Sequence, residues 1–269
     1  MNKRGQSSRG ITVLELMVAM AIFGVICAAM FGLLQLSQQR YKNESQLSGS
    51  FQEARLGVDQ IVRDINVSGY PSLGMFSTPQ SINSYAVAPF AWQPGYPTNS
   101  TCQVDVSCTL TANTGGPSDF ELVVETDLGN CNPASCVSWI RYLLNGTTLY
   151  RGVAAKTAAP DPLTAIPLAS MTPFVENVMN NPPGGLLAEI KAQYPAMYPL
   201  GAVPIFQYTC NTPQGPQPCS TSPANYNTPK NISDVDVTLI VKTKYADSQT
   251  HLLQVMELTG RGHVTNPSY

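Results

Sequence analysis

The chain has 269 residues and a formal net charge of −2, with 12% charged and 43% hydrophobic residues. A nearly neutral chain with this apolar content offers no surface for a polyanion, and it excludes a disordered tail or a collagen. The 22 prolines and 20 glycines predict many turns, and the seven cysteines fit an oxidising compartment if they pair.

A short basic leader precedes a long apolar stretch. The leader, residues 1–10, contains Lys3, Arg4 and Arg9 and no acid, and no side chain from residue 16 to residue 34 is charged or strongly polar. Such a stretch, as a helix, is about 28 Å long, which is enough to cross the hydrocarbon core of a bilayer. Because the positive flank comes first, we expect the N-terminus in the cytoplasm and everything after residue 36 on the far side.

Two ordinary interpretations of this stretch compete. A secretory signal peptide would have a shorter apolar stretch and a small-residue cleavage site, but no clean A-x-A sequence precedes Gln35. A plain signal anchor fits the hydropathy but leaves Glu15 unexplained. A carboxylate one turn inside an apolar span is costly and usually has a partner. Glu15 is the fifth residue after Gly10.

The register of glycine, glutamate and apolar span resembles the class III signal of type IV pilins and pseudopilins. The matching residues are Gly10, Ile11, Thr12, Leu14 and Glu15. The resemblance implies that a prepilin peptidase cleaves after Gly10 and N-methylates Ile11, although most family members have Phe there. It also implies that Glu15 pairs with the Ile11 amine of an adjacent subunit; the alternative is a neutral carboxyl group facing lipid.

The helix is expected to continue past the membrane, from Thr12 to Val67, over about 84 Å. An apolar stripe with spacings of three and four residues predicts that its second half packs on a sheet. The stripe consists of Leu47, Phe51, Ala54, Val58, Ile61 and Ile65. The expected organisation is a leader (1–10), a transmembrane and filament-core helix (11–36), its amphipathic continuation (37–68) and a disulfide-containing periplasmic or extracellular β domain (69–269).

Beyond the helix the sequence predicts a loop and then strands. The proline- and aromatic-rich loop 85–97 is either an exposed contact surface or a loop whose Phe90 and Trp92 tuck under the domain, and we favour the second. Strands are expected at 120–126, 137–144, 147–151, 204–208, 235–241 and 252–258, with a hairpin turn at Asn145–Gly146. Residues 152–204 are expected to form a proline-broken insertion with a short helix near 185–193.

This order of long helix, loop and antiparallel meander resembles the pilin fold, an α+β fold in which a long N-terminal transmembrane helix packs on an antiparallel β-sheet. Segments 139–153 and 204–208 and the final hairpin are similar to PilW-type minor pilins and the pseudopilin J class. The resemblance implies a structural minor pilin that primes or caps type IV pilus assembly. The alternatives are a minor pseudopilin of a type II secretion system and a pilus-associated adhesin or binding module.

The same resemblance implies where the protein acts and with what. It would sit in the bacterial inner membrane with its C-terminal domain in the periplasm, and then in the pilus on the cell surface. Its partners would be the prepilin peptidase, other major and minor pilins or pseudopilins, the inner-membrane assembly platform and the membrane itself.

Six of the seven cysteines follow the span, and their spacing alone fixes no unique pairing. They are Cys102, Cys108, Cys131, Cys136, Cys210 and Cys219. Because they come as sequence neighbours, local pairing (102–108, 131–136 and 210–219) is the simplest arrangement, each bond stabilising the fold by roughly 2–3 kcal/mol. Cys27 lies in the span, where we expect an apolar filler.

Motifs that carry chemistry are missing from the sequence. There is no P-loop, G-x-S-x-G or H-E-x-x-H motif, so we expect neither an enzyme nor a cofactor. Zinc is disfavoured because there is no C-x-x-C and the only histidines are His251 and His263, which we expect at the surface. Asp234 and Asp236 with loop acids could bind calcium, although such a pair is more often a solvated face. No basic run exceeds two residues, so nucleic-acid binding has no support.

Overall fold

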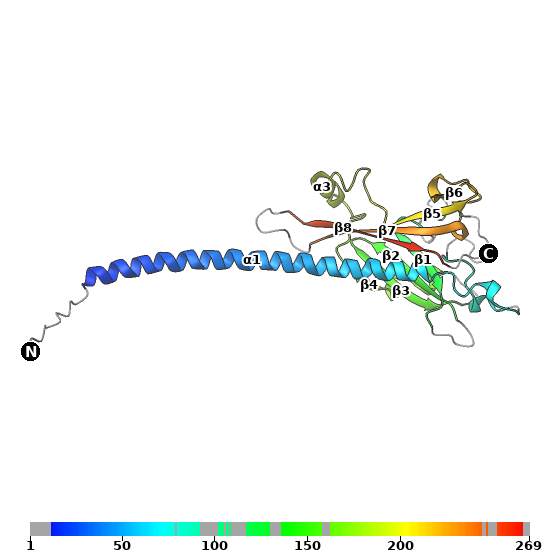
Figure 1. The fold of residues 1–269 in the computed structure, drawn as a ribbon, viewed down its shortest axis with the longest axis horizontal. Coiled ribbons are helices and arrows are strands. Elements are labelled where there is room, and N and C mark those ends of the chain that lie inside the picture. Colours follow the sequence, from blue (N-terminus) through cyan, green and yellow to red (C-terminus); the bar gives the residue numbers. More distant parts are fainter. Residues whose placement is uncertain are drawn as a thin grey trace, which may run out of the picture.

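A single long helix carries a β domain on its C-terminal half in the computed structural model of the chain (Figure 1). The structure describes residues 12–78, 80–91, 102–104, 106, 108, 117–129, 136–157, 162–243, 246 and 252–265. The helix, α1, runs from Val13 to Asn66 without a break, which confirms the helix expected between Thr12 and Val67. No proline interrupts these residues, so the backbone hydrogen-bond ladder can continue over the whole helix.

The C-terminal end of α1 is fixed by the β domain. The amide of Val67 still donates to Arg63 O, and Gly69 then takes a positive φ of 79° and donates its own amide to Glu125 O at 2.8 Å. The Thr126 hydroxyl donates to Val67 O at 2.7 Å. The orphan groups at the helix terminus therefore pair with the first strand of the domain, as buried backbone groups must.

Eight strands form two antiparallel four-stranded sheets. The first sheet has the order β1-β2-β3-β4 and the second the order β6-β5-β7-β8. The strands are β1 (Glu121–Thr126), β2 (Ser138–Asn145), β3 (Thr148–Ala155), β4 (Thr172–Val175), β5 (Phe206–Thr212), β6 (Gly215–Pro218), β7 (Ile232–Lys242) and β8 (Val255–His263). The turn at Asn145–Gly146, with φ of 63° at Gly146, joins β2 to β3 as expected.

Short helices lie in the connections. They are α2 (Pro162–Ala165), α3 (Leu186–Gln193) and the 3-10 helices η1 (Leu73–Met75), η2 (Ile82–Ser84), η3 (Leu168–Ser170), η4 (Cys219–Thr221) and η5 (Pro229–Asn231). The helix α3 confirms the short helix expected near 185–193. Ile190 of α3, together with Tyr198, packs in a small cluster against Ile240 of β7.

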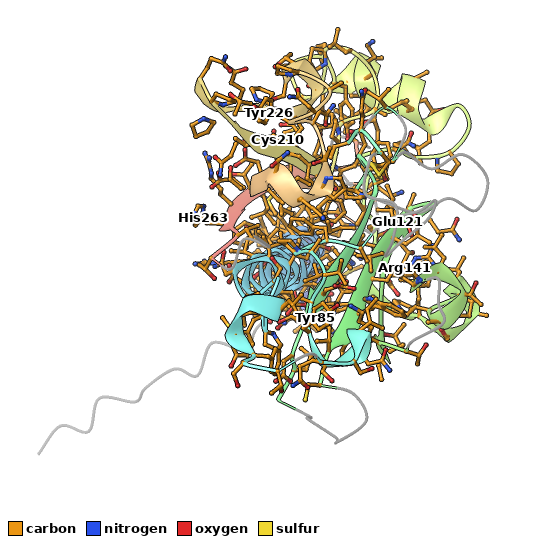
Figure 2. The ribbon with its side chains drawn as sticks, turned by 90° about the vertical axis from the view of Figure 1, so that its right-hand side faces the viewer. Tyr85, Glu121, Arg141, Cys210, Tyr226 and His263 are labelled. Atoms are coloured by element: carbon orange, nitrogen blue, oxygen red, sulfur yellow. A yellow bond between two sulfur atoms is a disulfide. The ribbon has the colours of Figure 1, made fainter. Side chains whose placement is uncertain are left out.

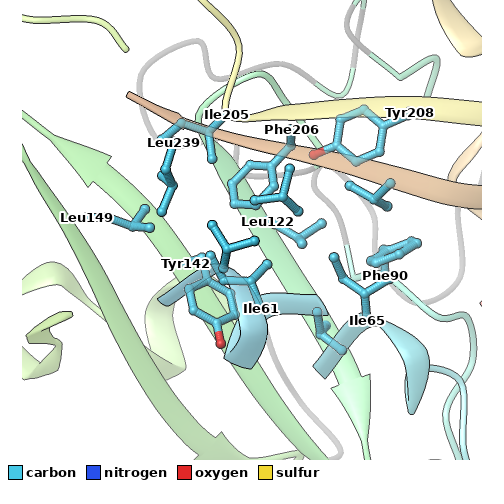
Figure 3. Close-up of a cluster of buried hydrophobic side chains, with 14 of the residues drawn as sticks. Ile61, Ile65, Phe90, Leu122, Tyr142, Leu149, Ile205, Phe206, Tyr208 and Leu239 are labelled. Carbon is cyan, nitrogen blue, oxygen red and sulfur yellow. The ribbon is translucent and has the colours of Figure 1, made fainter. Parts of the chain in front are cut away.

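The main core lies where α1 meets both sheets (Figure 3). Ile61 and Ile65 of α1 are fully buried among apolar side chains from both sheets and the 70–91 segment. These side chains include Phe90, Leu122, Tyr142, Leu149, Phe206 and Leu239. Phe90 therefore tucks under the domain as favoured, while Trp92 lies outside the described residues.

The fold class is confirmed, but three details of the expected β domain were wrong. The strands form two sheets rather than one meander. The supposed insertion 152–204 contains β4, and β6 was not expected at all. The last strand begins at Val255, three residues later than expected, and continues through Gly260 and Gly262 to His263.

Candidate functional site

Glu15 lies in the first turn of α1, where it closes a capping box with Thr12. The Thr12 amide donates to Glu15 Oε2 at 3.0 Å, and the Glu15 amide donates to Thr12 Oγ1 at 3.3 Å. The Thr12 hydroxyl also donates to Glu15 Oε2, at 3.1 Å. Two orphan donors of the helix terminus are thereby satisfied within the subunit. A carboxylate has further acceptor capacity, so Glu15 can still receive a cation from outside.

The helix residues that follow Glu15 are apolar and exposed. Among residues 12–36 only Cys27 is even half-buried, and large side chains such as Phe23 and Leu33 are 67% and 69% exposed. Mean hydropathy reaches 2.5 over 18 residues, and none of that window is covered by the rest of the protein. An apolar surface of this length is unstable in water and requires lipid or other apolar helices around it.

Between the apolar stretch and the β domain lies a polar part of the helix, residues 37–53, which we call the neck. None of its residues is buried; Leu47 and Phe51 of the expected stripe are only half-buried. Burial begins at Ala54, so the neck holds the domain about 25 Å along the helix from the end of the apolar stretch. Arg40, Tyr41 and Lys42 follow that end and are exposed, as is typical of the interfacial region of a bilayer.

A buried carboxylate on α1 fixes the helix to the first sheet. Asp64 is 3% exposed and accepts hydrogen bonds from the Tyr142 hydroxyl at 2.6 Å and from Arg151 Nη2 at 3.0 Å. Gln60 donates to its other oxygen at 2.8 Å. The pKa of Tyr142 is raised by burial and then by the neighbouring Asp64 charge, so its hydroxyl keeps the proton that it donates.

The first sheet also buries two ion pairs. Arg141 Nε donates to Glu121 Oε1 at 2.6 Å, and Lys156 Nζ lies 3.3 Å from Glu125 Oε1. Glu125 also accepts from Trp139 Nε1 at 2.7 Å. Burial raises the pKa of Glu125 and lowers that of Lys156, each opposed by the partner's charge. Cations and hydrogen bonds inside the domain hold both carboxylates.

An acid cluster on the second sheet resembles a catalytic arrangement only superficially. Asp234 accepts from Arg261 Nε at 3.2 Å and lies 3.0 Å from His263 Nδ1. Ser233 donates its hydroxyl to Asp234 rather than to the histidine, so no nucleophile is activated. His263 is exposed, as expected, and His251 lies outside the described residues. Figure 2 shows His263 at one margin of the domain, across α1 from Glu121 and Arg141.

The acids of this cluster also bear on the calcium question. Asp234 is engaged by Arg261 and His263, and Asp236 lies 3.8 Å from Arg261. Within the described ranges no group of three or more His, Cys, Asp or Glu side chains converges as metal ligands would. Asp234 is 9% exposed, so it lies in an ion-paired cluster and not on a solvated face.

The cysteines beyond the span form local disulfides. Cys102 bonds Cys108 and Cys210 bonds Cys219. Cys136 is disulfide-bonded, but Cys131 is outside the described part of the chain, so the 131–136 pairing stays a prediction. Cys27 carries a free thiol.

Of the residues expected to act in processing and assembly, the structure places only Glu15, because Gly10 and Ile11 lie outside the described residues. The sequence did not reveal Asp64 as buried. It lies beside the apolar stripe, and its partners Tyr142 and Arg151 follow 78 and 87 residues later. The reciprocal Thr12–Glu15 cap was visible in the T-x-x-E spacing, a known helix-start signal.

Comparison with known proteins bears on the N-terminus. The model of the prokaryotic N-terminal methylation motif matches residues 5–31, which include Gly10, Ile11 and Glu15. No match to the chain was found among curated proteins or among solved structures. The methylation motif, the exposed apolar helix and the antiparallel sheets packed on the last quarter of that helix together fit a type IV pilin-like protein.

Proposed function

We propose that the protein is a minor pilin, a non-catalytic subunit that primes or caps the assembly of a type IV pilus. In this proposal a prepilin peptidase removes residues 1–10 and N-methylates Ile11. The helix first anchors the subunit in the inner membrane, with the β domain in the periplasm, and then enters the filament core among other pilins. The size of the β domain, with two sheets rather than one, supports an accessory subunit.

The observation that carries the proposal is the position of Glu15. It is an acid at the start of a helix whose next nineteen residues are apolar and, apart from the half-buried Cys27, exposed. Its own subunit offers it the amide and hydroxyl of Thr12 but no described cation. The processed amine of Ile11 on a neighbour would be a cation in the same apolar layer, and two such groups offset each other's desolvation only by pairing.

The capping box makes a sharp test possible, because the cap and the charge can be separated. Glu15→Gln keeps an oxygen that can accept from the Thr12 amide but removes the charge. Glu15→Ala removes both, and Thr12→Ala weakens the cap, at about 1 kcal/mol of helix stability, while it keeps the charge. Each variant is expressed at native level in a strain that lacks the wild-type gene, and surface pili are counted by electron microscopy.

We expect all three proteins to be inserted and cleaved, because removing a charge from hydrocarbon does not impede insertion. Glu15→Gln and Glu15→Ala should fail to restore pili, and Thr12→Ala should restore them. Full complementation by Glu15→Gln would rule out the amine–carboxylate pair. The same strains, assayed for exoprotein secretion, separate the pilus from the type II pseudopilus: loss of secretion with normal pili would overturn the proposal in favour of a pseudopilin.

A further inference from the structure

The two sheets have four edge strands, and three of these edges are closed. On β1 the segment 89–91 lies against the outer edge: Ala91 N donates to Val123 O at 2.9 Å, and Glu125 N donates to Pro89 O at 3.0 Å. Phe90 forms a bridge with Val124 at the same place. An incoming strand therefore finds the hydrogen-bonding groups of β1 already used.

Prolines close two more edges. The edge strand β4 has four residues and contains Pro173. The edge strand β6 also has four, and Pro216 and Pro218 alternate in it with Gly215 and Gln217. Proline has no amide to donate, and short, proline-containing edges are a recognised protection against pairing with other chains.

The fourth edge strand, β8, has none of these protections. It has nine residues, no proline and no bulge in its register with β7. Val264 N donates inward to Ser233 O, whereas His263 N donates outward to Asn66 Oδ1 at 2.8 Å. Alternation along the strand therefore turns the amides of Glu257, Thr259 and Arg261 outward. The described residues provide no hydrogen-bond partner for these three amides, and all three side chains are exposed.

The helix α1 packs on one face of β8 and leaves this edge accessible. Gly260 lies against Val58 and Gly262 against Ile65, and both residues belong to the set of β8 whose side chains face α1. These contacts advance together along both elements, so β8 runs in the same direction as α1, away from the membrane end (Figure 1). A strand added at the edge would lie beside the helix and parallel to the filament axis.

We propose that the outer edge of β8 accepts an antiparallel strand from a different pilin-like subunit anchored in the same membrane. The inference rests on the proposed function, and it names the surface through which the β domain selects its neighbour. Addition of a strand to an open edge gains backbone hydrogen bonds without a preformed pocket, and side chains at alternate positions supply specificity.

Geometry argues against a second copy as the occupant. Among the described edges a copy would offer only its own β8. Two antiparallel β8 strands would direct their α1 helices in opposite directions, because each β8 runs with its own helix. Two helices anchored from one side of one membrane cannot adopt that arrangement. For antiparallel pairing, the more stable arrangement per residue, the partner is therefore a chain whose edge strand runs toward the membrane while its helix runs away from it.

The exposed charges define the complementary strand. Arg261 is already engaged by Asp234 at 3.2 Å and Asp236 at 3.8 Å. Glu257 has no ion pair among the described residues, so it can take a cation from outside. The fitting strand carries Lys or Arg opposite Glu257, since opposite charges across strands stabilise pairing.

In-cell crosslinking on the full-length chain tests the proposal. Thr259 is replaced by the photoreactive residue p-benzoylphenylalanine, and adducts are identified by mass spectrometry of the crosslinked peptides. Glu257→Pro is then added to remove an outward amide without touching the ladder to β7. Glu257→Ala is the matched control, which keeps the amide, and Glu257→Lys reverses the charge at an exposed position where folding is not at risk. The same photoreactive residue at Lys230 reports on a distant exposed surface.

We expect an adduct between position 259 and an edge strand of another chain with an N-terminal methylation motif. Glu257→Pro should abolish it, and Glu257→Lys should reduce its yield several-fold, while Glu257→Ala reduces it less. No adduct, an adduct with a second copy, or an adduct unaffected by both Glu257→Pro and Glu257→Lys would overturn the proposal. If Glu15→Gln abolishes pili while position 259 gives no adduct, this inference fails and the proposed function stands. If Glu15→Gln assembles normally while the adduct forms, the proposed function fails and this inference stands.

Discussion

Gly262 of β8 lies so close to Ile65 of α1 that the Ile65 side chain packs directly on the backbone of the strand. A Cβ atom added at Gly262 would stand 2.5 Å from Ile65 Cγ2 and 2.7 Å from Ile65 Cβ. Gly260, two residues earlier, has the same relationship to Val58, with 2.5 Å to Cγ1. These two glycines form a flat strip on which the last quarter of α1 rests.

Gly262→Ala should therefore destabilise the β domain. The added methyl group meets a fully buried Ile65, and overpacking of this kind costs about 1–3 kcal/mol. At roughly 2–4 °C per kcal/mol, we expect the melting temperature of the detergent-solubilised protein to fall by about 2–12 °C. Gly74→Ala is the control, because a Cβ there meets nothing within 4 Å and should leave the melting temperature unchanged or slightly raised. Equal effects of both changes would contradict the close packing.

Processing is a second prediction. We expect the mature chain to begin at Ile11, with one methyl group on its α-amino nitrogen. The motif match over residues 5–31 and the Gly10–Glu15 register motivate this expectation. Intact mass spectrometry of protein from membranes with active prepilin peptidase measures it directly. A chain that keeps residues 1–10 in those membranes would contradict the class III signal.

The thiol count is a third prediction. Two disulfides are present, Cys136 is bonded, and Cys27 is free. Alkylation of denatured, unreduced protein should therefore add one label, at Cys27, and reduction should raise the total to seven. Three labels before reduction would mean that one of the expected local bonds does not form.

The buried Lys156–Glu125 pair gives a fourth prediction. Both side chains are almost fully buried, and Lys156 Nζ also donates to Tyr85 O at 3.0 Å. Lys156→Met would leave the Glu125 carboxylate buried without a cation, which typically costs about 3–5 kcal/mol. The double variant Glu125→Gln with Lys156→Met should regain most of this stability. Chemical denaturation of wild type, both single variants and the double variant gives the coupling energy, and purely additive effects would argue that the pair is not a unit.

Acid pH should weaken the cluster around Asp234. Burial raises the pKa of Asp234, but hydrogen bonds from His263, Arg261 and Ser233 outweigh it and lower the pKa below its usual value. A lowered folded-state pKa contributes stability above the unfolded pKa of about 3.9, and that stability is lost as the pH falls through the folded value. Near pH 6 the wild type should be more stable than Asp234→Asn by less than about 1 kcal/mol, since the partners are exposed. The measurement is the difference in melting temperature between the two proteins at each pH. The difference should shrink as the pH falls below the unfolded pKa and vanish below the folded one. A difference that grows with acidity would contradict the assignment.

The sequence predicted best where the physics is local. The length of α1, the hairpin at Asn145–Gly146 and the helix α3 all follow from periodicity and turn residues within short windows. The last strand was expected to end at Leu258, before two glycines that lie within β8. Gly260 and Gly262 instead serve a close approach of α1, which no local pattern reports.

The features that the sequence did not predict depend on contacts that only the tertiary fold creates. The strands β4 and β6 are four residues each and contain prolines, so they resemble turns until a neighbouring strand supplies their hydrogen bonds. Asp64 looked like part of a solvated helix flank, because its partners Tyr142 and Arg151 are brought to it only by the tertiary fold. The candidate site at Glu15 was found because all its signals lie within the first residues of the chain.

The side-by-side course of α1 and β8 also determines how the protein bears load. A force that pulls the apolar end of α1 acts along the helix axis. The β domain buries side chains of only the last quarter of that helix. Because β8 lies along the helix axis, such a force shears the contact surface instead of peeling it open from one end. Two sets of contacts then resist the force together. Asp64 is hydrogen-bonded to two residues of the first sheet, and the glycine strip on β8 packs against α1. The contacts that resist tension therefore lie mainly at the end of α1 farthest from the apolar stretch, and the neck adds the hydrogen bond from the Glu176 amide to Glu53 Oε1 at 2.8 Å.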